Sequence, residues 1–305
     1  VKMPIKYLSR EELDDVKYNN CIAESKQALL YGYTWYLDIV CDRWDVLVLG
    51  DYVAVMPVPW RKKHGIKYVH QPLWVLQLGI FSMKKNVDEL EFVTALKTRY
   101  KFVELRLNTG NSLDKLTSKS YVNQFQYLDL NDSHQQISKN FNRNRKRELK
   151  KAAQANLIEK WNDSPENLVT LFKNNIGRRL KSITEKDYKN LLSLLETCIA
   201  NEVGELLSIY DENQKLVASG FFLFHKKTVT ELVCATDLNN RSNGANTFLI
   251  DRALFNYQKN YNIFDFGGSS IKTIANYYES FGATTYQYLF LKVNRLPFLL
   301  RLFKS

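Results

Sequence analysis

The chain has 305 residues, of which 45% are apolar and 25% are charged, and it contains 17 Phe and 18 Tyr. This composition excludes a disordered chain, a fibrous protein and a small disulfide-stabilised scaffold. The 43 Lys and Arg residues exceed the 32 Asp and Glu residues, which gives a net charge of +11. The length fits one large domain or two modest ones, and usual domain sizes favour two.

The four cysteines and four histidines lie far apart in the sequence. Because zinc sites need closely spaced Cys or His pairs, we expect no structural metal site. Cys198 and Cys234 lie in apolar runs that are typical of buried free thiols, which favours a reducing compartment. The first residues lack the pattern of a signal peptide, and no apolar stretch approaches the length of a membrane span. We therefore expect a cytoplasmic protein.

The first half of the chain alternates helical and strand-like patterns. Residues 10–31 predict a first helix with Ser9 as its cap, because acidic residues follow Ser9 in the first turn. Two apolar runs around Gly50-Asp51 predict a β-hairpin over residues 45–58. The remaining predicted elements are strands at 67–70, 74–81, 102–107 and 121–130 and a helix at 87–100.

The second half follows a similar plan. A helix rich in Lys and Arg is predicted over residues 133–155, and two further helices begin at Pro165 and after Thr184. The other predicted elements are strands at 205–210, 215–225, 228–236, 263–266 and 285–293, a helix that ends near Tyr261 and a helix at 273–281. Both halves contain a hairpin followed by a helix and a strand. This repetition indicates an internal duplication, with domains at 1–125 and 126–305.

The second half also resembles a known fold family. The order of elements over residues 137–157, 216–236 and 263–288 resembles the GNAT N-acyltransferase fold. The motif Phe264-Asp265-Phe266-Gly267-Gly268 and the later segment Tyr277 to Ala283 are similar to the ending of Fem-like proteins. In that branch, which includes bacterial peptidoglycan-bridge aminoacyltransferases, two GNAT units stand in tandem. The resemblance implies an α/β (α+β) fold of tandem GNAT-like domains, each with a mixed, mainly antiparallel central sheet flanked by helices.

The resemblance also implies a reaction, the transfer of an acyl group from an acyl-CoA (acetyl-CoA or longer) to an amine. This chemistry needs a base for the acceptor amine and an acid for the leaving group. Tyr278 falls where many GNAT enzymes carry a Tyr general acid, or it is an ordinary aromatic of the helix. Asp265 either binds or deprotonates the amine, or only caps the Gly-rich turn after it. Glu231, inside a predicted strand, is either a base or a solvent-facing residue.

The loop before the helix that starts at Thr247 is the predicted cofactor site. The pyrophosphate of coenzyme A needs convergent backbone N–H groups, preferably at a helix N-terminus. Gly244 would let the backbone approach a phosphate closely, and Arg241 would add a cation. Asn246 replaces the last small residue of the family pattern, and an Asn-rich helix entry is also an ordinary cap. The predicted cofactor-binding residues are Asn240, Arg241, Ser242, Asn243, Gly244, Ala245 and Asn246.

The basic helix concentrates the positive charge of the chain. Seven of the thirteen residues from Lys139 to Lys151 are Lys or Arg, and one is Glu. Arg145 and Glu148 fall on the side of a weak apolar stripe, so most of the other cations face solvent or a ligand. Three alternatives stay open: a solvated helix face, an anionic small-molecule acceptor (phosphorylated or nucleotide-linked), and the phosphate backbone of tRNA. The predicted acceptor-binding residues are Arg143, Arg147, Lys150 and Ser269.

The sequence leaves two other functions open. One is a Fem-like transferase that takes its donor from aminoacyl-tRNA and acts on a peptidoglycan precursor, although the sustained heptads of the helical arm in several such enzymes are absent. The other is a catalytically silent GNAT-fold module that binds an anionic metabolite or a partner. DNA binding is not expected, because no helix-turn-helix signature occurs.

Overall fold

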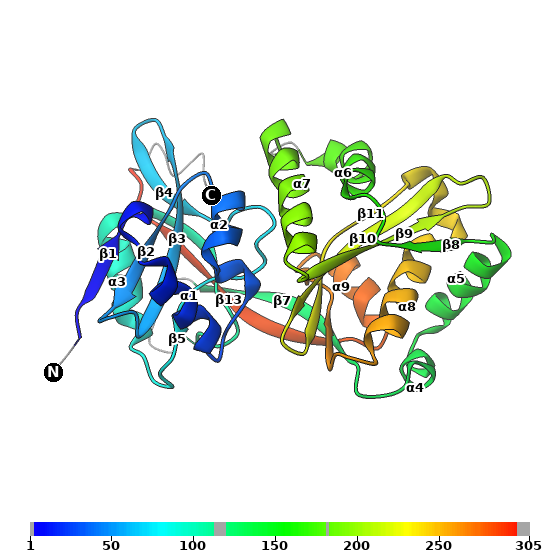
Figure 1. Ribbon diagram of the computed structural model, residues 1–305, viewed down its shortest axis with the longest axis horizontal. Coiled ribbons are helices and arrows are strands. Elements are labelled where there is room, and N and C mark those ends of the chain that lie inside the picture. The colour runs from blue at the N-terminus through cyan, green and yellow to red at the C-terminus, as the bar shows by residue number, and fades with distance from the viewer. Residues whose placement is uncertain (1–2, 113–119, 181–182, 298–305) are drawn as a thin grey trace. The chain divides into compact units, whose positions relative to one another are not determined.

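The computed structural model of the chain describes residues 3–112, 120–180 and 183–297 (Figure 1). Its contacts divide the chain into two compact units, which we call unit 1 (Val1–Asn123 with Gln287–Ser305) and unit 2 (Gln124–Tyr286). The predicted domains, 1–125 and 126–305, differ from these units at the end of the chain. The reason is that the last strand, β13 (Thr284–Asn294), begins in unit 2 and pairs with a strand of unit 1 from Phe290 onward.

Unit 1 is built around a sheet with the strand order β1, β2, β3, β4, β6 and β13. β4 and β6 run parallel, and the other neighbours run antiparallel. The predicted hairpin is confirmed as β2 and β3, and Gly50 adopts a φ of 58° in its turn. The strands are β1 (Ile5–Leu8), β2 (Trp44–Leu49), β3 (Ala54–Lys63), β4 (Ile66–His70) and β6 (Phe102–Arg106), and the helices are α1 (Asp15–Glu24), α2 (Thr34–Val40) and α3 (Glu89–Arg99).

The first helix is shorter than predicted. Instead of one helix over residues 10–31, a 3-10 turn, Arg10–Glu12, follows Ser9, and α1 begins only after Asp14. The Asp14 carboxylate accepts a hydrogen bond from the backbone N–H of Lys17 at 3.0 Å and so caps α1. Strand β1 and helix α2 have no counterpart in the sequence prediction.

The strand predicted over residues 74–81 is wrong. Among the described residues this segment contributes a single bridge, between Leu78 and Leu107, and the start of the two-residue β5 (Phe81–Ser82). Val75, Leu78, Ile80 and Phe81 of this segment are nevertheless buried, and Leu78 is fully inaccessible. The apolar run therefore reflects burial of an irregular segment, because burial alone does not distinguish a strand from a packed loop.

Unit 2 has the strand order β7, β12, β11, β10, β9 and β8. β11 and β12 run parallel, and the other neighbours run antiparallel. In Figure 1, α6 and α7 lie on one side of this sheet and α8 and α9 lie on the other. The strands are β7 (Ser120–Asp129), β8 (Ile158–Trp161), β9 (Gly204–Tyr210), β10 (Leu216–His225), β11 (Thr228–Thr236) and β12 (Ile263–Asp265), and the helices are α4 (His134–Lys139), α5 (Arg143–Gln154), α6 (Pro165–Asn174), α7 (Glu185–Ala200), α8 (Ala245–Tyr257) and α9 (Lys272–Glu279).

The predicted basic helix is two helices, α4 and α5, in the structure. Asn142 begins the second one, because its side-chain oxygen accepts a hydrogen bond from the backbone N–H of Arg145 at 3.0 Å. The predicted starts of two other helices are confirmed, since Pro165 opens α6 and Thr184 caps α7. The helix predicted from Thr247 begins two residues earlier, at Ala245. The short strand β8 after α5 has no counterpart in the prediction.

Buried aromatic rings hold β12 and α9 together in unit 2. The ring centres of Phe264 and Phe266 lie 4.9 Å apart, and that of Phe281 lies 5.9 Å from Phe266. All three side chains are at most 2% exposed, and each buried ring contributes roughly 1.5–3 kcal/mol. This packing fixes the end of β12 against the helix that follows it. None of the helices in the described ranges is long and apolar enough to cross a bilayer.

Candidate active site

The site begins where two parallel strands of unit 2 diverge. β11 and β12 pair over only three residues each, and the last pair is Thr230 beside Asp265. β12 ends at Asp265, whereas β11 continues to Thr236. The second half of β11 is therefore open on this side as far as the described strands extend. We call this region, with the side chains that meet there, the divergence site.

A bulge in β11 turns two reactive side chains to the same face. Phe222 of β10 pairs with Glu231, and Phe221 pairs with Val233. Leu232, between the two, therefore has no partner in β10. The extra residue places Glu231 and Cys234 on one face of the strand, since strand side chains otherwise alternate. Gly220 stands opposite Cys234 and faces α8. Both side chains therefore point toward the α8 and α9 side of the sheet.

Glu231 is the most unusual group of the divergence site. Its side chain is 3% exposed, and neither carboxylate oxygen has a hydrogen-bond partner among the described residues. Burial raises its pKa to about 7, and the nearby charge of Asp265 adds to this, whereas the Cys234 thiol acts in the opposite direction. Unpaired buried charges are costly in folded proteins. The prediction that Glu231 is solvent-facing is wrong, and the alternative of a base stays a prediction that this burial supports.

Asp265 and Tyr278 lie close to Glu231. Asp265 accepts a hydrogen bond from the Gly267 N–H at 2.9 Å, so it caps the Gly-rich turn, and burial raises its pKa to about 7. The Tyr278 ring stacks on Phe266 at 4.7 Å between ring centres. Burial, Glu231 and Asp265 together raise the pKa of Tyr278 well above its usual value. The three predicted catalytic residues therefore lie near enough to influence one another electrostatically.

A second group of side chains, missed by sequence analysis, borders the site. Arg145 of α5 is 7% exposed and donates a hydrogen bond to the Thr247 hydroxyl at 2.8 Å. It forms an ion pair with Glu148 at 3.0 Å, and its guanidinium lies 4.3 Å from the centre of the Tyr277 ring. The Tyr277 hydroxyl accepts a hydrogen bond from Asn246 at 2.8 Å. This network joins α5, α8 and α9, and its sequence signal was the Arg145–Glu148 spacing on the apolar side of the basic helix.

The predicted cofactor loop precedes α8 and folds as a 3-10 helix, Leu238–Asn243. Gly244 follows with a φ of 81°, and a Cβ built on it would lie 2.3 Å from the backbone oxygen of Glu148. Asn243 accepts a hydrogen bond from the Ala245 N–H at 3.0 Å. Close approach to α5 therefore accounts for Gly244, and Asn243 acts as an ordinary cap.

The other loop residues have different surroundings. Ser242 is exposed, whereas Asn246 is turned toward β11 and α9, because it bonds to Thr236 and Tyr277. The side chains of Asn240 and Arg241 lie outside the described residues. A cofactor-binding role for the loop stays a prediction.

Replacing Gly244 tests this account of the loop. We expect Gly244→Ala to lower the free energy of unfolding by about 3 kcal/mol, because it adds left-handed backbone strain to a clash with the α5 backbone. Gly65 is the matched control: its φ is 78°, but nothing lies within 4 Å of its Cβ position. Gly65→Ala should cost only about 1 kcal/mol. Urea unfolding of both variants measures the difference, and equal costs would contradict the close contact with Glu148.

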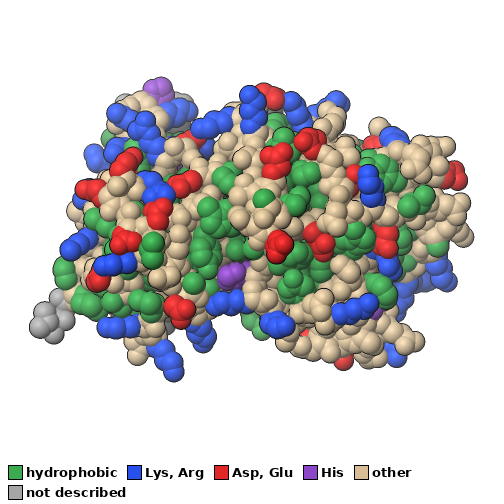
Figure 2. Space-filling view, viewed as in Figure 1, with side chains coloured by type: hydrophobic (Ala, Val, Ile, Leu, Met, Phe, Trp, Pro, Cys, Tyr) green, Lys and Arg blue, Asp and Glu red, His purple; other side chains and the backbone are tan. Residues whose placement is uncertain are grey.

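The predicted acceptor-binding residues fall in two places. Arg143, Arg147 and Lys150 are exposed on α5, where Lys and Arg side chains gather in Figure 2, and none of them pairs with an acid in the described ranges. Ser269 lies between β12 and α9, where its N–H donates to the side chain of Gln126 at 3.1 Å. No described contact joins Ser269 to the three cations. The structure therefore groups the cations with one another but not with Ser269.

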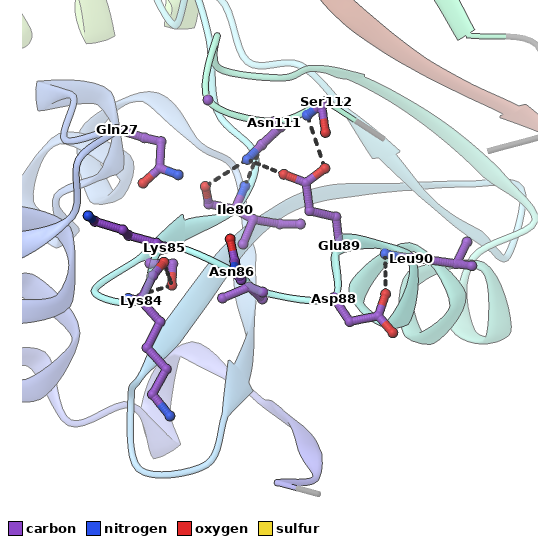
Figure 3. A pocket seen from close by; sticks show the side chains of 13 residues that line it. Gln27, Ile80, Lys84, Lys85, Asn86, Asp88, Glu89, Leu90, Asn111 and Ser112 are labelled. Carbon is purple, nitrogen blue, oxygen red and sulfur yellow. Dashed lines mark hydrogen bonds between the residues drawn. The ribbon is translucent and has the colours of Figure 1, made fainter. Parts of the chain in front are cut away.

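Unit 1 has a comparable helix entry with a different character. A cavity of about 490 Å³ lies at the start of α3 (Figure 3). There Asp88 accepts the Leu90 N–H at 3.1 Å, and Glu89 accepts the Ser112 N–H at 3.0 Å. In Figure 3, Lys84 points away from α3. The chain's own carboxylates thus occupy the helix N-terminus, which disfavours a phosphate there. No cluster of metal-ligating side chains occurs in the described ranges.

No family model and no curated protein match the chain, but solved structures do. FemX matches with a TM-score of 0.67 and 10% identity, over 99% of this chain and 100% of that one. The C-terminal domain of a putative lysylphosphatidylglycerol synthetase from Agrobacterium fabrum matches with a TM-score of 0.59 and 9% identity, over 92% of each chain. A tandem GNAT protein from the clavulanic acid biosynthesis pathway matches with a TM-score of 0.55 and 11% identity, over 96% and 99%. The predicted Fem-like, tandem GNAT fold is confirmed, and at these identities the likeness concerns the fold alone.

Proposed function

We propose that this chain is an N-acyltransferase that joins an acyl group to an amine at the divergence site. The observation that carries the proposal is the buried, unpaired carboxylate of Glu231 beside the open half of β11, with Asp265 and Tyr278 close by. Carboxyl groups with raised pKa values that share one site with a protonated tyrosine hydroxyl are typical of acid–base catalysis. The fold that the chain shares with a tandem GNAT protein supports this assignment.

The reaction assigns a role to each of the three groups. The acceptor nitrogen attacks the acyl carbonyl carbon, a C–N bond forms, and the bond from that carbon to the leaving sulfur or oxygen breaks. The amine proton passes to Glu231 or Asp265, whose pKa values of about 7 let them accept it near neutral pH. Tyr278, which stays protonated because its pKa is raised, donates its proton to the leaving group.

The donor in this proposal is an acyl-CoA, as the family resemblance implies, and the acceptor is a small amine that carries a phosphate or nucleotide. A thermal-shift titration with acetyl-CoA and longer acyl-CoAs tests the donor. We expect a saturable rise in unfolding temperature, because a ligand that binds only the folded state stabilises it. If a coenzyme A analogue without its sulfur or without a phosphate raises the unfolding temperature as much as the intact acyl-CoA does, the protein does not recognise the missing group. No shift with any acyl-CoA would contradict this donor.

A second candidate donor is an aminoacyl-tRNA used to modify a peptidoglycan precursor. Two observations favour it. Glu148 brings a carboxylate to Thr247 in the first turn of α8, where it would oppose a bound pyrophosphate. The exposed cations Arg143, Arg147 and Lys150 instead form a stripe suited to a phosphate backbone.

Charge removal on α5 distinguishes the two donors. We expect the triple variant Arg143→Ala, Arg147→Ala, Lys150→Ala to weaken tRNA binding about tenfold or more, and to reduce the slope of log affinity against log salt by about 2. Its stability should not change, since these side chains are exposed and unpaired. Filter binding across a salt series measures both quantities. The matched control removes three other exposed lysines of unit 2, Lys189, Lys226 and Lys272; equal losses in both variants would contradict a specific α5 surface.

A further inference from the structure

The β3–β4 hairpin of unit 1 carries a dense group of cations. In the register of this hairpin, Lys62 stands directly opposite Lys67, and like charges in this arrangement destabilise an antiparallel pair. Neither lysine forms an ion pair with a described residue, whereas Arg61 pairs with Asp42 at 2.8 Å. Figure 2 shows Lys and Arg side chains over the tip of this hairpin, at the upper left. The hairpin therefore holds unpaired positive charge at a fixed place.

A cavity lies beside this charge. Its volume is about 490 Å³, and the hairpin, the start of β2 and the end of α2 line it. Trp60 contributes a side chain that is 7% exposed and whose indole N–H donates to no described residue. The Lys67 ammonium lies 4.2 Å from the centre of the Trp60 ring, and the Arg43 guanidinium lies 5.1 Å from it. A buried donor and two cations thus meet around one ring.

Three of the four acids that line the same cavity are already engaged. Asp38 accepts hydrogen bonds from Arg10 and Trp44, and Asp45 accepts one from Tyr7 at 2.6 Å. Asp42 holds the Arg61 guanidinium of the hairpin. Arg43 and Lys67 have no comparable anion within the described ranges, and Glu11 is the remaining acid of the lining. The uncommitted groups of the cavity are therefore mainly hydrogen-bond donors and positive charges.

We propose that this cavity, which we call the Trp60 pocket, binds the phosphate group of a small-molecule ligand. A phosphate oxygen accepts the indole hydrogen bond that no described residue accepts, and Arg43 and Lys67, which both line the cavity, supply charge-assisted contacts to the anion. Ligand cavities usually measure about 300–1,000 Å³, so this volume suits a ligand up to the size of a mononucleotide and not a nucleic-acid strand. The pocket lies wholly in unit 1 and does not depend on the reaction proposed for unit 2.

Titration with inorganic pyrophosphate, followed by tryptophan fluorescence and calorimetry at constant ionic strength, tests the Trp60 pocket. We expect saturable binding that weakens about tenfold or more in the double variant Arg43→Ala, Lys67→Ala, because two charge-assisted contacts are lost. Trp60→Phe should weaken the binding measured by calorimetry, because the indole donor is lost, while Trp44, which also lines the cavity, still reports binding by fluorescence. The double variant changes exposed side chains, so it tests the proposal even if Trp60→Phe does not fold.

The control is Lys26→Ala, which removes an exposed cation of unit 1 outside the pocket. Unchanged affinity in this variant supports a specific pocket, whereas a loss equal to that of the double variant overturns it. Absence of saturable pyrophosphate binding also overturns the proposal. Vesicles of phosphatidylglycerol, compared with phosphatidylcholine, identify the source of the phosphate: competition with pyrophosphate indicates a lipid headgroup, and its absence indicates a soluble phosphate ester.

Discussion

Tyr278→Phe should lower the rate of acyl transfer by about a hundredfold or more while leaving stability unchanged. The loss follows from the removal of the proton that the leaving group receives, a contribution of about 10²–10⁴ in comparable reactions. Stability should hold because the substitution keeps the aromatic ring, which still stacks on Phe266. Turnover with a labelled donor and urea unfolding measure the two quantities.

The neighbouring Tyr277 is the matched control. Its hydroxyl accepts a hydrogen bond from Asn246 and lies 3.3 Å from the Thr247 hydroxyl. Tyr277→Phe should therefore lower the free energy of unfolding by about 1 kcal/mol, and its transfer rate should fall far less than that of Tyr278→Phe. Equal rates in the Tyr278→Phe variant and the wild type would contradict the role of Tyr278 as the acid.

Glu231→Gln should lower the rate of transfer by about a hundredfold or more and stabilise the protein at pH 8. The folded state raises the pKa of Glu231 from 4.5 to about 7, so between these values it binds a proton that the unfolded chain has released. Stability of the wild type must therefore fall as pH rises through this window, by about 3 kcal/mol in total. The Gln variant does not titrate and should keep that stability.

The measurement is the difference in free energy of unfolding between the variant and the wild type at pH 4.5 and at pH 8. We expect this difference to grow in favour of the variant by about 3 kcal/mol. Any fixed cost of burying the amide cancels in the comparison of the two pH values. Glu212→Gln, at an exposed turn position, should follow the wild-type curve. If the free energies of unfolding of the variant and the wild type change equally with pH, the folded state does not raise the pKa of Glu231, and the account is contradicted.

Local signals in the sequence predicted most of the elements correctly. The Gly50-Asp51 turn between apolar runs and the cap at Thr184 depend on short-range chemistry, and both are present. The strand predicted over residues 74–81 failed because its burial depends on distant contacts. The Leu78 N–H donates to the carbonyl of Arg106 at 2.8 Å, and the Asn108 N–H donates to the carbonyl of Leu78 at 2.6 Å. An apolar run alone did not contain that information.

The candidate site was predictable only in part. The family resemblance pointed to Tyr278 and Asp265, and the structure places them near Glu231. The network of Arg145, Thr247 and Tyr277 could not be predicted, because it joins segments that are far apart in the sequence. Arg145 and Thr247, for example, are 102 residues apart. Such contacts arise from the packing of α5 on α8, which no local pattern specifies. The same packing explains why residue 244 is a glycine, although the sequence alone suggested that Gly244 lets the backbone approach a bound phosphate.

The most direct test of acyl transfer at the divergence site uses hydroxylamine, a small amine that converts an acyl group into a detectable hydroxamate. The chain is incubated with radiolabelled acetyl-CoA or with an aminoacyl-tRNA, and hydroxamate is measured above a protein-free blank. We predict hydroxamate formation by the wild type with at least one donor, and a loss of about a hundredfold or more in both Tyr278→Phe and Glu231→Gln. No formation with either donor, or equal formation by the wild type and both variants, would contradict the proposed reaction.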